Sequence, residues 1–387
     1  MNQLTRRDFL RLCGTSSIGF ALAACGVTPT PTPTLVPTNT RLPTSTPLPT
    51  ATPTLTITPA PTNTATLIPT NTTTPTQQPS FNPEINIVAG RMRDDKGKIL
   101  EGAVSTHFMH TRYGGLTYFK KDAKTLRDWG ANSISIYWNS GYLKNDKYLS
   151  DLTQAVEEAN GLNLKVVLSL HSRGEEPIPN TTRTKESQII KVDAQLVADW
   201  EVLLIHPTYG KRISNVAGAY GIVSEAYYDY DGNRPSDATK LIEIYNRATD
   251  TIRRIVGVDV PSMWSPPNYG RQMNFFINIP PPRNRIVIDT HVYNGGDPPL
   301  SANWQDYILK LFDTGYAVYI GEAFWGARDS IEVANRKLEF FQKNSIPFAA
   351  WGLDSSSNDP NHLINTTNGI SQYGNLLQGA LKTLSGN

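Results

Sequence analysis

The most constraining feature of the sequence is a series of short apolar segments that alternate with amphipathic ones after Phe81. Several of the apolar segments carry no charge beyond their first residue, such as Lys165–Leu170. Continuous apolar runs of this length are typical of strands that are covered on both faces. The sequence predicts strands at 100–106, 132–138, 165–171, 216–225, 261–265, 285–291, 317–322 and 347–353, and helices that include 116–129, 148–160, 237–256, 304–313 and 331–344.

Strands that alternate with helices over about 300 residues predict an α/β fold, and we expect a single (β/α)₈ TIM barrel over residues 81–387. A doubly wound open sheet is the alternative. The first predicted strand is not followed by a Gly-rich phosphate turn, which counts against the nucleotide-binding forms of that alternative.

Residues 25–80 have a different composition from the rest of the chain. The stretch 27–80 holds 13 of the chain's 28 prolines and 21 threonines. Proline fixes φ and removes an amide donor, and few large apolar residues are present to form a core. The sequence therefore predicts a disordered, polyproline-like stalk, which at ~3.1 Å per residue would reach roughly 150 Å.

The first 24 residues have the pattern of an export signal, with basic residues followed by a short apolar run. Arg6-Arg7 followed by Phe9-Leu10 resembles a twin-arginine signal, and Leu22-Ala23-Ala24-Cys25 resembles a bacterial lipobox. The alternative is an ordinary signal peptide with a chance cysteine. The resemblance implies cleavage before Cys25, lipidation of its thiol, and a protein anchored to the membrane outside the cytoplasm. The only other cysteine, Cys13, would leave with the signal, so no disulfide or cysteine-ligated metal is expected in the domain.

The charge balance argues against a nucleic-acid partner. The net charge is +2, but the residues before the barrel account for +3, which leaves residues 81–387 near −1. No segment reaches the ~18 consecutive apolar residues of a membrane-spanning helix. We therefore expect no polytopic membrane protein and no polyanion-binding surface.

Polar and aromatic residues recur where the predicted strands end. In a barrel all these ends open onto one face, where active sites are built. Each residue alone also has an ordinary structural explanation, such as a cap, a loop acid or a core aromatic. The residues at these ends are Tyr137, Trp138, Asn139, His171, Glu225, Trp264, His291, Tyr293, Glu322 and Trp351, and Ser224 and Trp325 are further candidates beside them.

Two of these residues, Glu225 and Glu322, end apolar runs on the predicted fourth and seventh strands. A ring of eight strands ~4.8 Å apart has a radius of roughly 7.5 Å, so three steps around it span roughly 14 Å between backbones. Two inward glutamates would then leave about 6 Å between their carboxyl groups. That separation lies between the ~5–5.5 Å of retaining and the ~6.5–9.5 Å of inverting glycosidases.

Several motifs, in order along the chain, resemble those of cellulase-type glycoside hydrolase family 5. The segment 86–104 resembles the family's first hairpin and strand, 130–136 its second-strand motif, and 166–171 its third strand. The remaining matches are His291-Val292-Tyr293, Ile320-Gly321-Glu322 and Trp351.

The resemblance implies a retaining glycosidase in which Glu322 is the nucleophile and Glu225 the acid/base. It further implies that Tyr293 orients the nucleophile and that His171, His291 and Ser224 line the sugar subsite. Trp138, Trp264, Trp325 and Trp351 would be sugar-stacking platforms, with a core position as the alternative for some of them. It implies no cofactor and no metal.

Two positions depart from the family's pattern. The family's Asn-Glu-Pro at the acid/base is Ser224-Glu225-Ala226 here, and its second-strand arginine is Ser135. Arg112, His107 and His110 are the candidates to replace the arginine's charge. The expected function is endo-acting cleavage of β-linked poly- or oligosaccharides by a monomer, and the alternative is a catalytically silent barrel that binds glycans at the cell surface.

Other chemistries lack their signatures. His107 and His110 are three residues apart without the His-Glu-x-x-His zinc pattern. No Gly-x-Ser-x-Gly elbow is present for a serine hydrolase. Asp229 and Asp231 are alternative acids close to Glu225.

Overall fold

The computed structural model describes residues 85–109, 115–172, 190–191, 194–227, 235–257, 259–294, 301–324, 326, 328–357, 359, 361–365 and 369–385. The predicted signal segment 1–24 and stalk 25–80 lie outside these residues. Among the described residues, no helix combines the length and the hydropathy needed to cross a membrane.

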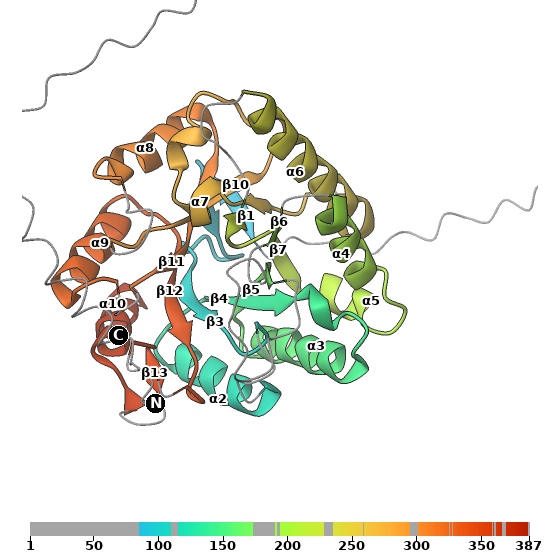
Figure 1. Cartoon of the computed structure of the whole chain (residues 1–387). Helices are drawn as coiled ribbons and strands as arrows, with labels where there is room; N and C mark the ends of the chain where they lie inside the picture. The colour runs from blue at the N-terminus through green and yellow to red at the C-terminus, as the bar shows by residue number, and fades with distance from the viewer. Residues whose placement is uncertain are drawn as a thin grey trace, which may run out of the picture. The chain divides into compact units, whose positions relative to one another are not determined.

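A closed ring of eight parallel strands forms the centre of the fold, and helices surround it (Figure 1). Each strand pairs with its neighbour in the ring, and the pairing of β11 with β12 and of β12 with β3 closes it. The predicted (β/α)₈ TIM barrel is therefore confirmed. The barrel strands are β3 (Glu101–Ser105), β4 (Ser133–Asn139), β5 (Lys165–Ser172), β7 (Ala217–Gly221), β9 (Ser262–Trp264), β10 (Ile286–His291), β11 (Ala317–Ala323) and β12 (Phe348–Leu353).

The outer helices and small strands follow the predicted alternation. Helices expected from the sequence appear within two residues of their predicted bounds, whereas α4, α5, α7 and α10 were not predicted. The helices are α2 (Gly115–Asp128), α3 (Asp146–Gly161), α4 (Ala194–Leu204), α5 (Gly210–Ser214), α6 (Pro235–Val256), α7 (Pro267–Gly270), α8 (Trp304–Thr314), α9 (Ile331–Lys343) and α10 (Gln372–Ser385), with 3₁₀ turns η2 (Ser140–Tyr142) and η4 (Met273–Phe275). Short strands outside the ring are β1 (Asn86–Val88), β2 (Arg91–Arg93), β6 (Ile190–Lys191), β8 (Ala226–Tyr227), β13 (Ile364–Asn365) and β14 (Gly369–Ile370).

The fourth barrel strand is shorter than predicted. The sequence predicts a strand over 216–225, but β7 ends at Gly221. Hydrogen bonds to neighbouring strands continue past its end, from the Ile222 amide to Met263 and from the Ser224 amide to Leu170. Glu225 therefore follows a segment that is held against both neighbouring strands.

Side chains along each barrel strand alternate between two hydrophobic cores. One core fills the barrel interior and includes Tyr137, Val167, Met263 and Tyr319. The larger one lies between the barrel and its helices. Because successive strand residues point to opposite faces, this alternation decides which strand-end residues can reach a site inside the barrel mouth.

An antiparallel hairpin of β1 and β2 lies at the amino-terminal end of the barrel. Arg91 of β2 pairs with Val318 of β11, and Met92 contributes its buried side chain to the interior core. This hairpin confirms the one predicted for 86–104. It covers the end of the barrel opposite the candidate site.

Gly102 is a sensitive point of strand pairing, because it faces Ser133 across β3 and β4. A Cβ atom on Gly102 would overlap the Ser133 carbonyl oxygen. We expect Gly102→Ala to lower the free energy of unfolding by about 1–3 kcal/mol, as overpacking of a core does. At the exposed Gly379 of α10 a Cβ atom would meet nothing within 4 Å, so Gly379→Ala should instead gain about 0.5–1 kcal/mol. Equal effects of the two substitutions in chemical denaturation would contradict this explanation.

Candidate active site

Glu225, His291 and Glu322 come together at the carboxyl end of the barrel. Glu225 follows β7, His291 ends β10, and Glu322 lies near the end of β11. His291 Nδ1 lies 3.2 Å from Glu225 Oε1 and 3.4 Å from Glu322 Oε2. One oxygen of each carboxylate lies within 4.8 Å of the other. The two acids thus face each other across the barrel mouth, as the strand geometry predicted.

Tyr293 holds one of these carboxylates directly. Its hydroxyl donates a hydrogen bond of 2.9 Å to Glu322 Oε2. The residue is buried and lies just beyond the end of β10. The geometry fits the orienting role that the sequence resemblance implied.

The mouth of the site contains a group of stacked rings. His171 stacks on Tyr137 with 5.1 Å between ring centroids and an angle of 23°. Trp351 lies 6.0 Å from the same tyrosine and is partly exposed. Trp351 packs against the interior core, and His171 is close enough to Glu225 to lower its pKa, so both side chains belong to the barrel interior that holds the carboxylate pair.

Trp138 and Trp264 do not lie in this mouth, and their predicted role as platforms is wrong. Both are fully buried in the core between the barrel and its helices. Trp138 packs edge-on against Trp200, and Trp264 stacks on Tyr245. The cause is strand alternation, because Tyr137 faces the barrel interior and its neighbour Trp138 must face outward.

Of the remaining predicted positions, the structure describes Ser224 but not several others. Ser224 is fully buried beside Glu225, and its carbonyl accepts a hydrogen bond of 2.8 Å from Ser265 Oγ. Trp325 and the predicted lipidation site Cys25 lie outside the described residues, as do Arg112, His110, Asp229 and Asp231.

The two carboxylates have opposite pKa shifts. Burial raises the pKa of Glu322 to about 7, and the nearby charge of Glu225 adds to this, while His291 and the Tyr293 hydrogen bond oppose it. Burial also raises the pKa of Glu225, but its hydrogen bond with His291 and the positive charges of His291, His171 and Arg271 outweigh this and lower it. With substrate absent, the proton of the pair therefore favours Glu322.

His291 supplies positive charge between the two acids. Burial lowers the pKa of its imidazole, but the charges of Glu322 and Glu225 and the hydrogen bond with Glu225 outweigh it and raise that pKa to about 9. The ring is fully buried. An imidazolium held in this way reduces the repulsion between two carboxylates in a dry site.

The family's second-strand arginine has no equivalent cation on β4. Ser135 points into the barrel and hydrogen-bonds the Tyr319 hydroxyl at 2.9 Å. Arg271, just after α7, is nearly buried and is close enough to the carboxylate pair to lower the pKa of Glu225. Sequence reasoning missed Arg271, because it comes from a loop that no strand pattern marks.

Two interior residues received no role in the sequence analysis, although Tyr137 was named there among the residues at the strand ends. Tyr137 precedes Trp138, and the period-2 alternation of a strand would have identified it as the inward aromatic. Asp289 is two residues before His291 on β10 and is likewise buried inside the barrel. Burial raises the pKa of Asp289 to about 7.

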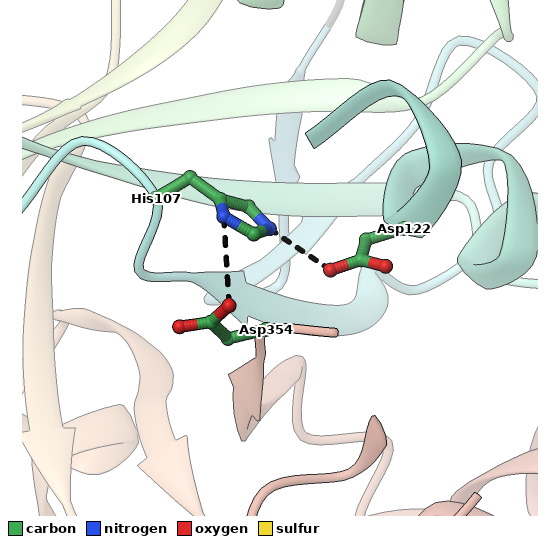
Figure 2. Close-up of side chains that lie close together, drawn as sticks. All are labelled: His107, Asp122 and Asp354. Atoms are coloured by element: carbon green, nitrogen blue, oxygen red, sulfur yellow. Dashed lines mark hydrogen bonds and ion pairs between the residues drawn. The ribbon is translucent and has the colours of Figure 1, made fainter. Parts of the chain in front are cut away.

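His107 does not supply the missing charge to Glu322, because it is held elsewhere. Figure 2 shows its ring between Asp122 of α2 and Asp354, which follows β12. The Nε2 atom lies 2.9 Å from Asp122 Oδ2, and Nδ1 lies 3.6 Å from Asp354 Oδ1. All three side chains are buried.

Both clusters of histidine and carboxylate contain residue types that can bind a metal ion. In the His107 cluster, the two ring nitrogens face different carboxylates (Figure 2). Hydrogen bonds already hold this cluster together, since Asp122 Oδ2 lies 2.9 Å from His107 Nε2 and also accepts a hydrogen bond of 2.7 Å from the Ser355 amide. In the Glu225–His291–Glu322 cluster, the hydrogen bond between His291 and Glu225 and the ion pair of His291 with Glu322 account for the short distances.

Comparison with known proteins finds one family and many similar folds. The profile of the family described as cellulase (glycosyl hydrolase family 5) matches residues 96–357. No curated protein sequence matches the chain.

The solved structures that resemble the chain include three glucan-degrading enzymes. A β-glucanase from Saccharophagus degradans in complex with cellotetraose has 19% identity and a TM-score of 0.58, covering 78% of this chain and 93% of that one. A thermostable, halotolerant GH5 cellulase from an Icelandic hot spring isolate has 17% identity and a TM-score of 0.56, covering 78% and 94%. The catalytic domain of Thermobifida fusca endoglucanase Cel5A, also with cellotetraose, has 12% identity and a TM-score of 0.55, covering 77% and 97%. At these identities the likeness extends to the fold alone.

Asp289 should make stability depend on pH. Its pKa in the folded state, about 7, lies above its unfolded value of 3.8, so its contribution to stability is fully present below pH ~4 and is lost as pH rises through ~7. Asp289→Asn cannot ionise, and a tenfold change in a protonation equilibrium corresponds to about 1.4 kcal/mol. The free energy of unfolding of this variant, measured relative to that of the wild type, should therefore increase by a few kcal/mol as the pH is raised from 4 to 8.

Chemical denaturation at both pH values measures the difference. Asp313→Asn, at an exposed position of α8, is the matched control and should show no such trend. A constant difference between Asp289→Asn and the wild type across this range would contradict a raised pKa for Asp289.

Proposed function

Because the chain belongs to the cellulase family, glycosyl hydrolase family 5, we propose that it is a retaining β-glycosidase in which Glu322 is the nucleophile and Glu225 the acid/base. The observation that carries this assignment is the pair of facing carboxylates within 4.8 Å at the barrel mouth. So close an approach of one oxygen from each acid favours the ~5–5.5 Å separation of carboxyl groups in retaining enzymes over the ~6.5–9.5 Å of inverting ones.

The reaction proceeds in two displacements. A Glu322 oxygen attacks the anomeric carbon and the glycosidic C–O bond breaks, while Glu225 gives its proton to the departing oxygen. The resulting glycosyl ester on Glu322 is then attacked by water, whose proton passes to Glu225. Release of the sugar regenerates the carboxylate of Glu322. The Tyr293 hydroxyl, at 2.9 Å from Glu322, stabilises the carboxylate before attack and after release.

Substrate binding must move the proton of the pair. In the free site this proton favours Glu322, yet the first step requires an ionised Glu322 and a protonated Glu225. The Glu225 side chain is 30% exposed and that of Glu322 is 5% exposed, so a bound sugar removes more water from Glu225. Desolvation raises the pKa of a carboxyl group, and the proton then favours Glu225.

The proposed substrate is a β-linked glucan that is cleaved at internal linkages. Support comes from the similar folds of a β-glucanase and an endoglucanase that were both solved with cellotetraose. The partly exposed Trp351 beside the pair offers a face on which a sugar ring can stack. Mannans and xylans are the alternative substrates, and release of reducing sugar from each polymer distinguishes them.

A second candidate is a barrel that binds glycans without cleaving them. The observation that favours it is the loss of two family residues, since Ser224 and Ser135 replace the asparagine and the arginine. Glycan binding by the wild type, with no reducing sugar released from β-glucan, mannan or xylan, would support this alternative.

Substitution of either glutamate tests the assignment. We expect Glu322→Gln to lower kcat at least about 10³-fold on every substrate, because no nucleophile remains. Glu225→Gln should lose similar activity on polysaccharide but far less on an aryl glycoside, whose leaving group needs no proton. On that substrate it should also lose the fall in kcat/KM that the wild type shows above pH ~7, where the shared proton dissociates.

Asp259→Asn, at an exposed position, is the control. Hydrolysis that survives both glutamine substitutions would exclude these residues as the catalytic pair.

We also propose that the protein is exported and anchored outside the cytoplasm through a lipid on Cys25. The support is sequence pattern alone, with Arg6-Arg7 before an apolar run and Leu22-Ala23-Ala24-Cys25 after it. A stalk rich in threonine and proline then gives the barrel reach toward an extended polymer.

Metabolic labelling with a fatty acid tests the anchor in a bacterial host that modifies lipoproteins. The full chain should carry label and sediment with membranes, and Cys25→Ser should do neither. Cys13→Ser is the matched control and should remain labelled. Equal labelling of Cys25→Ser and the wild type would contradict the proposed anchor.

A further inference from the structure

A buried ion pair lies against the backbone segment that carries Tyr293. Lys337 of α9 and Asp329, in the loop after β11, approach to 2.7 Å between Nζ and Oδ1. Their side chains are 3% and 0% exposed. Taking two charges out of water is costly, and such a pair can be replaced by apolar residues without loss of stability in other proteins. Stability alone is therefore a weak explanation of why it lies here.

The pair contacts the backbone on both sides of Tyr293. Lys337 Nζ donates to the Val292 carbonyl at 2.6 Å, and the Asn294 amide donates to Asp329 Oδ1 at 2.9 Å. The first contact fixes the peptide group before Tyr293, and the second fixes the one after it. Both peptide groups of a single residue are thus tied to one ion pair.

Strand pairing does not hold the backbone at Tyr293. Strand β10 ends at His291, two residues earlier. One further hydrogen bond, from the Val292 amide to the Glu322 carbonyl at 3.1 Å, joins this segment to β11. The ion pair is held in turn from α10, because the Tyr373 hydroxyl donates to the Asp329 carbonyl at 2.6 Å.

We propose that Lys337 and Asp329 are positioning residues for Tyr293, which they hold so that its hydroxyl stays on Glu322. Neither residue touches the carboxylate pair in the contacts described above, so they act through the tyrosine. The catalytic consequence rests on the proposed role of Glu322 as nucleophile, but the positioning itself does not. Arg271 and Arg328 lie near the Tyr293 ring, each with 5.8 Å from guanidinium carbon to ring centroid, and they complete its surroundings.

The first measurement does not need activity. The pKa of Glu322 is followed by carbon NMR of labelled glutamate, with the signal assigned by its absence in Glu322→Gln. The Tyr293 hydrogen bond lowers this pKa, so Tyr293→Phe should raise it. Lys337→Met should raise it in the same direction although Lys337 does not contact Glu322, and Lys337→Arg should restore most of the wild-type value. The exposed Lys343 lies on the same helix, and Lys343→Met is the control.

The second measurement is a double-mutant cycle on kcat/KM. We expect Lys337→Met to reduce kcat/KM roughly tenfold to hundredfold, as displacement of a positioned group does. In the Tyr293→Phe background, the same substitution should cost less than about twofold more, because the residue through which it acts has lost its hydroxyl. The fall in kcat/KM above pH ~7, where the shared proton dissociates, should move to higher pH in both single variants.

The outcomes distinguish positioning from catalysis. If the pKa of Glu322 shifts in Tyr293→Phe but not in Lys337→Met, the positioning role is wrong. It is also wrong if the effects of the two substitutions on kcat/KM are fully additive in the double variant. If the wild type hydrolyses no glycoside but both substitutions still shift the pKa of Glu322, the proposed function is refuted and the positioning role stands. If Lys337→Met fails to fold, the variant that combines it with Asp329→Asn removes both charges together and takes its place in both measurements.

Discussion

Two carboxylates held within 4.8 Å of each other set the conditions for the rest of this barrel. Like charges at that distance cannot both ionise cheaply in a dry site, so the pair must share a proton or have a cation beside it. The chain provides the cation as His291, which contacts both acids, and it keeps the proton because Glu322 is buried. The closed barrel fixes this distance, because Glu225 and Glu322 are held by strands on different sides of it.

The serine at position 135 changes how the charge in this site is balanced. Ser135 bonds Tyr319 within the barrel instead of supplying a positive charge beneath Glu322. Positive charge comes from above, through His291 at the strand end and Arg271 after α7, and both lower the pKa of Glu225. The proton favours Glu322 in the free site because Glu322 is buried and because these positive charges lower the pKa of Glu225.

Sequence patterns predicted the strands and helices that alternate along the chain. They did not predict side chains whose contacts lie on distant elements of the fold. Strands and most helices appear close to their predicted bounds, because continuous apolar runs and amphipathic stretches are local signals. The two acids were found because each follows such a run. Trp138 was given a role in the site in place of its neighbour Tyr137, although the alternation of side chains along β4 predicts that only one of the two faces the barrel interior. Arg271 and the Lys337–Asp329 pair carry no local signal, since the groups they serve lie on other elements of the fold.

The contacts around the His107 cluster bear on how the barrel closes during folding. Thr106 and Asp354, and Asp122 and Ser355, are joined by hydrogen bonds across 248 and 233 positions of sequence, at the seam where β3 meets β12. Contacts between such distant residues form only after most of the polypeptide exists. A nascent chain on the ribosome, lacking β12, therefore presents the bare edges of β3 and β11 to other chains. Synthesis reaches β12 only at Phe348, and this strand removes both edges at once, so termination before it is a route to aggregation.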